Sequence, residues 1–334
     1  MGTLRLGLLS TANINREILA GAAASDRVEV AAVGSRDRDR AESYAATNGI
    51  PRAHGSYAAL LADDGVDAVY VSLPNGMHHE WTMRALAAGK HVLCEKPYTR
   101  RPAEVDEAFA TAESAGLVLM EAFMYRHHPQ TREIERLVRE GAIGAPIAVL
   151  ATFTFPLGDL TDVRAQPQLD GGALMDVGCY CVSGARLVAG EPVSVLAEQV
   201  TGPTGIDMAL YGTMRLAGDV VAQFEASFVA PRRQYLEVVG EEAVLIARAP
   251  FRVDWGGALE LVRGGETRVV DVPEASSYRL QLENLADAVE GDAAPLLGRA
   301  DALGQARAIE ALYASAASGV AVTLSARRTG PQRR

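Results

Sequence analysis

Apolar runs alternate with helical patterns through the first 122 residues of the chain. Short runs rich in aliphatic and β-branched residues predict strands at 4–10, 28–35, 67–74, 91–96 and 117–122. Helical patterns fill the intervals at 15–25, 37–49, 56–64, 79–90 and 102–116, and several end at a glycine suited to a helix C-cap. Strands that are apolar on both faces and separated by helices indicate a parallel sheet covered on both sides. The sequence therefore predicts a doubly wound, nucleotide-binding α/β domain.

The pattern changes after a further predicted helix at 127–144. Strand-like runs follow at 147–155, 193–200, 208–216, 220–228, 234–240 and 243–249, several of them joined by short turns. Short turns between successive strands predict an antiparallel or mixed sheet. Helical patterns at 277–291 and 301–319 end the chain. We expect a dinucleotide-binding Rossmann domain at 1–122, an α+β substrate and oligomerisation domain at 123–325, and a basic tail at 326–334.

Composition narrows the class of protein. The 334 residues are 49% hydrophobic and 22% charged, which is typical of a globular protein, and the formal charge is −10. This acidity disfavours nucleic acid as a partner. No apolar run reaches the roughly 20 residues needed to cross a bilayer, so we expect no membrane span. The three cysteines form no disulfide framework, and we expect a cytoplasmic protein.

The first turn, in the stretch GLLSTANI (7–14), is a degraded dinucleotide corner. Ser10, Ala12 and Asn15 stand where the fingerprint has glycines. Small side chains are mild substitutions, the hydroxyls of Ser10 and Thr11 can donate to phosphate oxygens, and the following helix N-terminus favours an anion. A plain strand–turn–helix corner with Asn13 or Asn15 as the N-cap fits equally well. The candidate phosphate contacts are Ser10, Thr11, Ala12, Asn13 and Ile14.

The end of the second strand bears on the choice of cofactor. Ser35 replaces the acidic residue that would bind a ribose 2′-hydroxyl, and Arg36 and Arg40 follow it. A hydroxyl and guanidinium groups suit a 2′-phosphate, which favours NADP while leaving NAD possible. The alternative is a solvated helix start in which aspartates balance the arginines.

Two strand ends carry family motifs, SLPNGMHH (72–79) and CEKP (94–97). With MEAFMYRHHPQ (120–130) and GGALMDVGCYCV (171–182), they resemble the Gfo/Idh/MocA family, named for glucose–fructose oxidoreductase and inositol dehydrogenase. The likeness covers nearly the whole chain. Residues matching the strand-end motifs, and so expected at the cofactor, are Ser72, Leu73, Pro74, Asn75, His78, Glu95 and Lys96.

The resemblance implies an NAD(P)-dependent oxidoreductase that acts on a small-molecule sugar or polyol and forms a homodimer or homotetramer through its C-terminal sheet. It implies that Glu95 and Asn75 touch the nicotinamide ribose and that Lys96 lies between cofactor and substrate. Asp176 and Tyr180 take the places of a carboxylate and a proton-transfer residue. Because Tyr180 replaces the histidine of inositol-dehydrogenase-like members, the resemblance moves toward aldose dehydrogenases, dihydrodiol dehydrogenases and nucleotide-sugar ketoreductases.

The chemistry of these residues is consistent with that role. Hydride leaves a carbinol carbon only as its hydroxyl proton is removed, so a base is needed. Tyrosine titrates near pH 10, and we expect the Lys96 ammonium to favour its phenolate. On a helix, Asp176 and Tyr180 would share one face. Three alternatives stay open: Lys96 as a surface lysine, Asp176 as an N-cap or first-turn carboxylate, and Tyr180 as a core residue.

Other residues leave questions open. The pairs His78–His79 and His127–His128 lack a recognisable ligand pattern, so we expect no metal. Arg126, Arg164 and His128 are candidate contacts for substrate hydroxyl or phosphate groups. Alternative functions are a nucleotide-sugar ketoreductase acting in the reducing direction, an NAD-dependent glycosidase of the same fold, and a cofactor-sensing binding protein without turnover.

Overall fold

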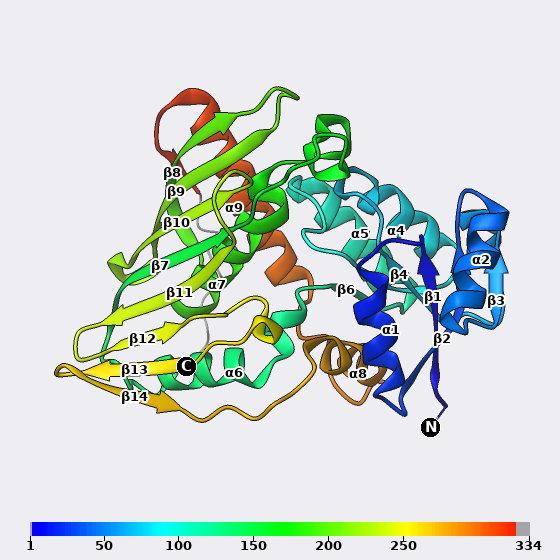
Figure 1. Cartoon of the computed structure of the whole chain (residues 1–334), viewed down its shortest axis with the longest axis horizontal. Coiled ribbons are helices and arrows are strands. Elements are labelled where there is room, and N and C mark those ends of the chain that lie inside the picture. The colour runs from blue at the N-terminus through cyan, green and yellow to red at the C-terminus, as the bar shows by residue number, and fades with distance from the viewer. Residues whose placement is uncertain (1, 325–334) are drawn as a thin grey trace.

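The computed structural model describes residues 2–324 and contains two sheets (Figure 1). The first sheet is parallel, with strand order β3-β2-β1-β4-β5-β6. Its strands are β1 (Leu4–Leu9), β2 (Val28–Gly34), β3 (Arg52–His54), β4 (Ala68–Val71), β5 (His91–Cys94) and β6 (Leu119–Glu121). The order reverses beside β1, and in such sheets ligands bind outside the carboxyl ends of the strands at this switch point.

Helices cover both faces of this sheet, as the apolar character of its strands predicts. They are α1 (Asn15–Ala23), α2 (Arg38–Asn48), α3 (Tyr57–Leu61), α4 (His78–Ala87) and α5 (Pro102–Ala115), with a short 3-10 turn, η1 (Asn75–Met77), before α4. Strands β1, β4 and β5 are almost entirely buried. The predicted doubly wound parallel sheet is confirmed.

The second sheet is mixed and has nine strands in the order β14-β13-β12-β11-β7-β10-β9-β8-β15. Its strands are β7 (Pro146–Thr154), β8 (Pro192–Thr201), β9 (Asp207–Leu216), β10 (Val221–Ser227), β11 (Arg233–Gly240), β12 (Val244–Ala247), β13 (Leu259–Arg263), β14 (Glu266–Val270) and β15 (Val322–Thr323). Among the described strands of this sheet, only the β7–β10 pair is parallel. The predicted large mixed sheet is confirmed.

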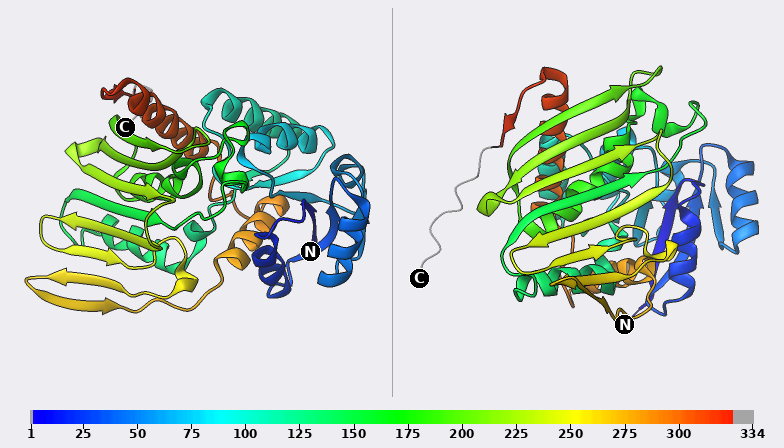
Figure 2. Two further views of the ribbon diagram at one scale, coloured as in Figure 1. Left: turned by 45° about the horizontal axis from the view of Figure 1, so that its top comes forward. Right: turned by 60° about the vertical axis from the view of Figure 1, so that its left-hand side comes forward.

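One face of the second sheet is covered and the other is open. The covering elements include α6 (Pro129–Arg139), α7 (Cys179–Ala189) and α9 (Arg299–Ser318). In the right-hand view of Figure 2 the strands face the viewer with no helix in front of them. Burial alternates along the strands accordingly, with Val149 and Ala151 buried and Leu150 38% exposed. The uncovered face therefore carries its own set of apolar side chains.

The two halves of the chain interlock. Helix α8 (Ser277–Glu290), near the end of the chain, packs against α1 beside the first sheet (Figure 1). A Cβ on Gly21 of α1 would lie 3.0 Å from the backbone nitrogen of Arg279, so the glycine permits the close approach. Helix α9 likewise packs against α5. The division near residue 123 stays a prediction, and the predicted basic tail at 326–334 lies outside the described residues.

Several elements were not predicted. Strand β3 has three residues, and β13 and β14 form a hairpin whose outer strand is largely exposed. The segment η5 (Leu174–Gly178) is a π-helix that runs directly into α7. The expected helix at 127–144 is shorter, because a 3-10 turn, η2 (Met124–His127), precedes Pro129 and α6 ends at Arg139. The remaining short 3-10 turns are η3 (Val163–Ala165), η4 (Pro167–Leu169), η6 (Ala217–Asp219) and η7 (Val253–Trp255).

Candidate active site

The corner after β1 adopts a glycine-like conformation without a glycine. Ser10 has φ of +140°, a region that side chains rarely adopt. Three contacts hold it there: its hydroxyl lies 2.9 Å from that of Ser72, the Ala12 N–H donates to its Oγ at 3.1 Å, and the Asn15 amide donates to its carbonyl at 2.8 Å. The Ser10 hydroxyl is thus engaged inside the protein, and the expectation that it donates to phosphate is not supported.

The rest of the corner suits an anion. The backbone N–H groups of Thr11, Asn13 and Ile14 make no hydrogen bond to any described residue, and they precede the N-terminus of α1. Neither asparagine caps the helix: Ile14 is the N-cap residue and no side chain bonds there. Free N–H groups at a helix start form an anion site, whereas a plain capped corner would have used them.

The end of β2 is free of carboxylates that could face a ribose. Ser35 is buried, and the side chain of Asp37 is occupied as the N-cap of α2, accepting from the Arg40 N–H at 2.8 Å. Arg36 and Arg40 are exposed and have no carboxylate within ion-pair distance among residues 2–324. By contrast, Arg38 pairs with Glu42 at 2.8 Å.

The expected cofactor residues at the end of β4 differ in how far their side chains are exposed. Ser72 and Leu73 are buried, while Pro74 and Asn75 are partly exposed at the strand end. His78 is fully buried, and its two ring nitrogens lie 3.0 Å from the Pro97 carbonyl and 2.8 Å from that of Leu73. Burial lowers the pKa of His78. His78 therefore lies between the ends of β4 and β5, with both ring nitrogens next to backbone carbonyls, and its contact with the cofactor stays a prediction.

Glu95 and Lys96 follow β5 at the adjacent strand end. The Tyr70 hydroxyl donates to the Glu95 carboxyl, and burial raises the pKa of Glu95. The Lys96 ammonium donates to the Asp176 carbonyl at 2.8 Å and lies 3.4 Å from Asp176 Oδ1. It also lies 4.6 Å from the centroid of the Tyr180 ring. Lys96 is therefore a largely enclosed cation, its side chain 12% exposed, held between two other candidate residues, and not a surface lysine.

The π-helix explains how Asp176 meets Lys96. Its wider turn places Asp176 so that both its carbonyl and its carboxylate face the ammonium, and Arg164 Nε bonds the other carboxylate oxygen at 2.9 Å. Burial raises the pKa of Asp176, but Lys96 and Arg164 lower it further, so the pKa lies below its usual value. Asp176 links two cations. It is not the N-cap, which is Ala173, but it does lie in the first turn of the π-helix, as the alternative interpretation expected. π-Helical turns are frequent at functional sites.

Tyr180 lies in an aromatic cluster with its hydroxyl directed at sulfur. The rings of Phe123, Phe153 and Phe251 have centroids 5.3 to 5.5 Å from its own, and its hydroxyl lies 3.5 Å from the Met124 sulfur. Burial and the Glu95 carboxyl raise the pKa of Tyr180 well above its usual value. Lys96 covers the ring face of Tyr180 rather than its hydroxyl, and the raised pKa disfavours the expected phenolate in this arrangement.

The three residues expected to contact the substrate, Arg126, His128 and Arg164, have different partners in the structure. Arg126 pairs with Asp301 of α9 at 3.3 Å, and His128 is the N-cap of α6 and accepts from the Gln130 N–H at 3.0 Å. Both are structural. Arg164 reaches Asp176 and is the one of the three that joins the site.

A buried carboxylate that contacts the π-helix, that of Asp207, was not predicted from the sequence. The Asp207 carboxylate accepts from the Leu174 N–H at 2.7 Å and from the Tyr313 hydroxyl at 3.0 Å. Burial raises the pKa of Asp207 to about 6. In the sequence, Asp207 is an acidic residue at the start of a largely apolar strand. This position does not by itself show which groups the carboxylate contacts.

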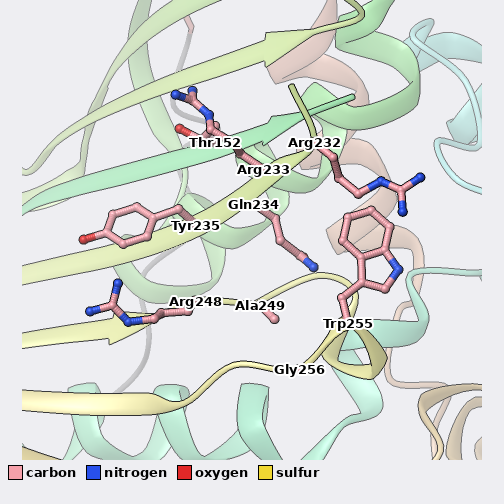
Figure 3. A pocket seen from close by; sticks show the side chains of 9 residues that line it. All are labelled: Thr152, Arg232, Arg233, Gln234, Tyr235, Arg248, Ala249, Trp255 and Gly256. Carbon is pink, nitrogen blue, oxygen red and sulfur yellow. The ribbon is translucent and has the colours of Figure 1, made fainter. Parts of the chain in front are cut away.

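Two hollows of the described surface lie elsewhere. One has a volume of about 830 Å³ and is lined by residues from β7, from β11, from the segment directly after β12 and from the loop around Trp255 (Figure 3). The Arg232 guanidinium lies 4.8 Å from the Trp255 ring centroid. A second, of about 440 Å³, lies over outward residues of β7–β10. Neither includes Lys96 or Tyr180, and both follow from the uncovered sheet face.

No described helix is long and apolar enough to span a membrane. Within residues 2–324, no three His, Cys, Asp or Glu side chains gather closely enough to hold a metal ion.

Comparison with known proteins gives matches along the whole chain. Residues 5–123 match the family described as GFO/IDH/MocA, an oxidoreductase family with an NAD-binding Rossmann fold, and residues 131–246 match a GFO/IDH/MocA C-terminal domain. D-xylose 1-dehydrogenase (NADP⁺) 2 from Haloferax volcanii is 42% identical over 325 residues, which are 96% of this chain and 100% of that protein.

Solved structures agree with this match. A 3-ketoreductase from Actinomadura kijaniata in complex with NADP and TDP-benzene has a TM-score of 0.88 at 32% identity, covering 94% of this chain and 98% of the other. Its solved forms include a tyrosine-to-phenylalanine and a lysine-to-alanine variant. An aldose–aldose oxidoreductase from Caulobacter crescentus has a TM-score of 0.89 at 28% identity, covering 97% of this chain and 100% of the other.

Proposed function

Because the chain belongs to the Gfo/Idh/MocA family of oxidoreductases, we propose that it moves a hydride between NADP and a carbinol or carbonyl carbon of a sugar. It is an NAD(P)-dependent oxidoreductase acting on CH–OH groups. Two of the relatives are named as an NADP⁺-dependent D-xylose 1-dehydrogenase and as a 3-ketoreductase in complex with NADP. These names support an aldose as the substrate.

The residues present fit NADP. Thr11, Asn13 and Ile14 offer unbonded backbone N–H groups to a pyrophosphate. Arg36 and Arg40 offer guanidinium groups without a carboxylate partner in the described chain, beside the end of β2 where an acidic residue would select NAD. When bound, the nicotinamide accepts or supplies the hydride. The strand ends at Asn75 and Glu95 are where it would be held.

The observation that carries the proposal is the arrangement of Lys96, Asp176 and Tyr180. Two of the three ammonium hydrogens of Lys96 have acceptors on Asp176, which leaves one for a substrate oxygen. Burial lowers the pKa of Lys96, but Asp176 raises it further, so the ammonium stays charged. It can stabilise negative charge that develops on the substrate oxygen. In the A. kijaniata ketoreductase, the lysine and tyrosine replaced in solved variants are separated along the chain as Lys96 and Tyr180 are.

Tyr180 supplies the proton transfer in this proposal. Its hydroxyl faces a thioether, a weak acceptor, and so loses little by bonding a substrate oxygen instead. A neutral phenol donates a proton to a forming alkoxide, which supports reduction of a keto-sugar as the second candidate function. In the oxidising direction Tyr180 can take the substrate hydroxyl proton only as the phenolate, so its own proton must leave first, with Lys96 stabilising the alkoxide.

The test is reduction of NADP⁺ and NAD⁺ by the purified protein with D-xylose and D-glucose. We expect turnover with a preference for NADP⁺. Lys96→Met should lower kcat about 100-fold or more, because a charged donor to the reacting oxygen is lost. Tyr180→Phe should lower it by a similar factor while NADPH binding, followed by fluorescence, survives.

Tyr211→Phe serves as the matched control, since Tyr211 is 46% exposed on the sheet face. Full turnover in both site variants would refute the proposed chemistry. NADPH oxidation by a nucleotide-linked keto-sugar, with no turnover of aldoses, would favour the ketoreductase.

The proposed assembly is a homodimer or homotetramer through the second sheet. Leu150, Leu196, Val200 and Tyr211 are 38 to 55% exposed on the uncovered strands. An apolar face of this extent on a nine-stranded sheet is typical of a surface that pairs with another subunit.

A further inference from the structure

Arg164 lies in a long connection between β7 and the π-helix, residues 155–173, whose described regular structure consists of the two short 3-10 turns η3 and η4. Long connections of this kind usually carry function when they are ordered. The connection at 155–173 belongs to the second half of the chain and contacts the first half. The Asn75 amide at the end of β4 donates to the Asp170 carbonyl at 3.0 Å, and Arg101 pairs with the Asp170 carboxylate at 2.8 Å.

The backbone of Arg164 is fixed on both sides. Its N–H donates to Asp162 Oδ1 at 2.9 Å, and its carbonyl accepts from the Gly172 N–H at 2.9 Å. A Cβ on Gly171 would overlap that same carbonyl oxygen, so the glycine at 171 is required for the chain to pass so close. Gly172 has φ of +130°, which also favours glycine.

The guanidinium is fixed as well, except at one end. Arg164 Nε bonds Asp176 Oδ2 at 2.9 Å, and Nη1 lies 3.2 Å from Asp162 Oδ1. Nη2 has no hydrogen bond to any residue in the range 2–324, and the side chain is 44% exposed. A planar fork with two anchored nitrogens presents its third in a defined direction at little entropic cost.

The guanidinium is linked to the candidate catalytic groups through Asp176. Asp176 joins Arg164 to Lys96, because its two carboxylate oxygens face one cation each. Lys96 in turn has one unbonded ammonium hydrogen. The site therefore presents two cationic donors on either side of one carboxylate, each with a hydrogen available to a ligand.

We propose that Arg164 is a specificity-determining residue whose Nη2 binds the substrate oxygen on the carbon next to the reacting one. The substrate is then a vicinal diol or the corresponding hydroxy-ketone, with Lys96 on the reacting oxygen and Arg164 on its neighbour. This inference rests on the proposed function and narrows its substrate class. A site built to bond a hydroxyl rejects analogues that lack it, because its own donor is left unpaired.

A purely electrostatic role is the competing explanation. Arg164 lowers the pKa of Asp176 after Lys96 does, and this effect needs only a positive charge. Arg164→Lys keeps that charge but lacks the second arm of the fork. Discrimination between a diol and its deoxy analogue separates the two explanations, because an effect on Asp176 alone would slow both substrates alike.

The experiment measures kcat/KM for D-glucose and 2-deoxy-D-glucose with NADP⁺ in the wild type, Arg164→Met and Arg164→Lys. We expect the wild type to prefer D-glucose, and both variants to reduce that preference at least about 10-fold. Arg139→Met is the matched control, since Arg139 is exposed on α6 and has no ion pair among the described residues. NADPH fluorescence titration verifies that each variant is folded.

An unchanged preference in Arg164→Met would overturn the inference while leaving the proposed function in place. Full preference in Arg164→Lys would also overturn it, by showing that charge alone suffices. A wild type that turns over neither D-glucose nor D-xylose would refute the proposed aldose dehydrogenase, and the inference would fall with it.

Discussion

Glu121 is a carboxyl group enclosed where the two halves of the chain meet. It ends β6, is 2% exposed, and one of its oxygens accepts from the Tyr98 N–H at 2.8 Å. The other oxygen has no hydrogen-bond partner. Burial raises the pKa of Glu121 to about 7, and Asp301 adds to the shift while Arg186 and Arg126 oppose it. The folded protein therefore binds a proton here that the unfolded chain releases near pH 4.5.

This shift predicts the pH dependence of stability. Between the unfolded pKa near 4.5 and the folded pKa of about 7, the folded state holds more protons, so the free energy of unfolding falls as pH rises. The full effect is about 3 kcal/mol. Glu121→Gln keeps the acceptor for Tyr98 and removes the titration. Urea unfolding at pH 5 and pH 8 should show a smaller stability difference in the variant, and an equal difference in both proteins would contradict the assignment.

Residue chemistry in the sequence predicted which side chains would lie together but not how they would be oriented. Lys96, Asp176 and Tyr180 are brought together, as the family motifs implied. The sequence could not show that the ammonium faces the ring of Tyr180 rather than its hydroxyl, because this depends on a turn widened by one residue. The surroundings of His78 were equally unpredictable, because a histidine at a strand end looks the same in the sequence whether it faces a ligand or two carbonyl groups.

At the level of elements, the π-helix is the one on which the site depends. Its first turn is held by Asp207 of β9, which receives the Leu174 N–H and the Tyr313 hydroxyl of α9. Helix α9, strand β9 and the π-helix are thereby joined at one carboxylate. Periodicity predicted the strands and helices of the parallel sheet well, because burial on both faces leaves long apolar runs. It could not predict the π-helix, whose pattern over 174–178 continues into α7 without a break.

Asp207→Ala should therefore loosen the π-helix and displace Asp176. Two buried donors lose their acceptor, which should cost about 2 kcal/mol or more in the free energy of unfolding. We expect kcat to fall at least about 10-fold, since Asp176 no longer fixes Lys96, with the NADPH dissociation constant changed far less. Asp219→Ala is the control, because the Asp219 side chain is 94% exposed. Equal effects of the two substitutions on urea unfolding and kcat would count against this role of Asp207.

The whole molecule combines a covered, interlocked interior with one uncovered sheet face. Composition and alternation predicted both sheets, but a strand that alternates in a single chain gives no sign of what covers its outer side. The packing of α8 against α1 could not be predicted either, because helical periodicity does not show which neighbouring element a helix contacts. Burial of the uncovered face in an oligomer is the proposal that can be tested at this scale.

Light scattering coupled to size exclusion should give a mass at least twice the 35.4 kDa of one chain. Leu196→Lys places a charge among the apolar residues of the uncovered face and should shift the population toward the monomer. Val320→Lys, at a residue 60% exposed after α9, should not. A wild-type mass of one chain would refute assembly through this face.

The anchored connection at 155–173 has a consequence for how such an enzyme changes over evolutionary time. Its backbone is tied at Asp162, Asp170 and Gly172, whereas neighbouring residues such as Leu160 and Val163 are exposed and lie outside the core. Under the role proposed for Arg164, mutations at such positions would alter which sugar is accepted and leave in place the strand ends proposed to hold the cofactor. In this arrangement the residues that would set the substrate range and the residues that would carry the chemistry lie in separate segments of the chain. A mutant library confined to residues 155–173 is therefore an efficient way to search for new substrates.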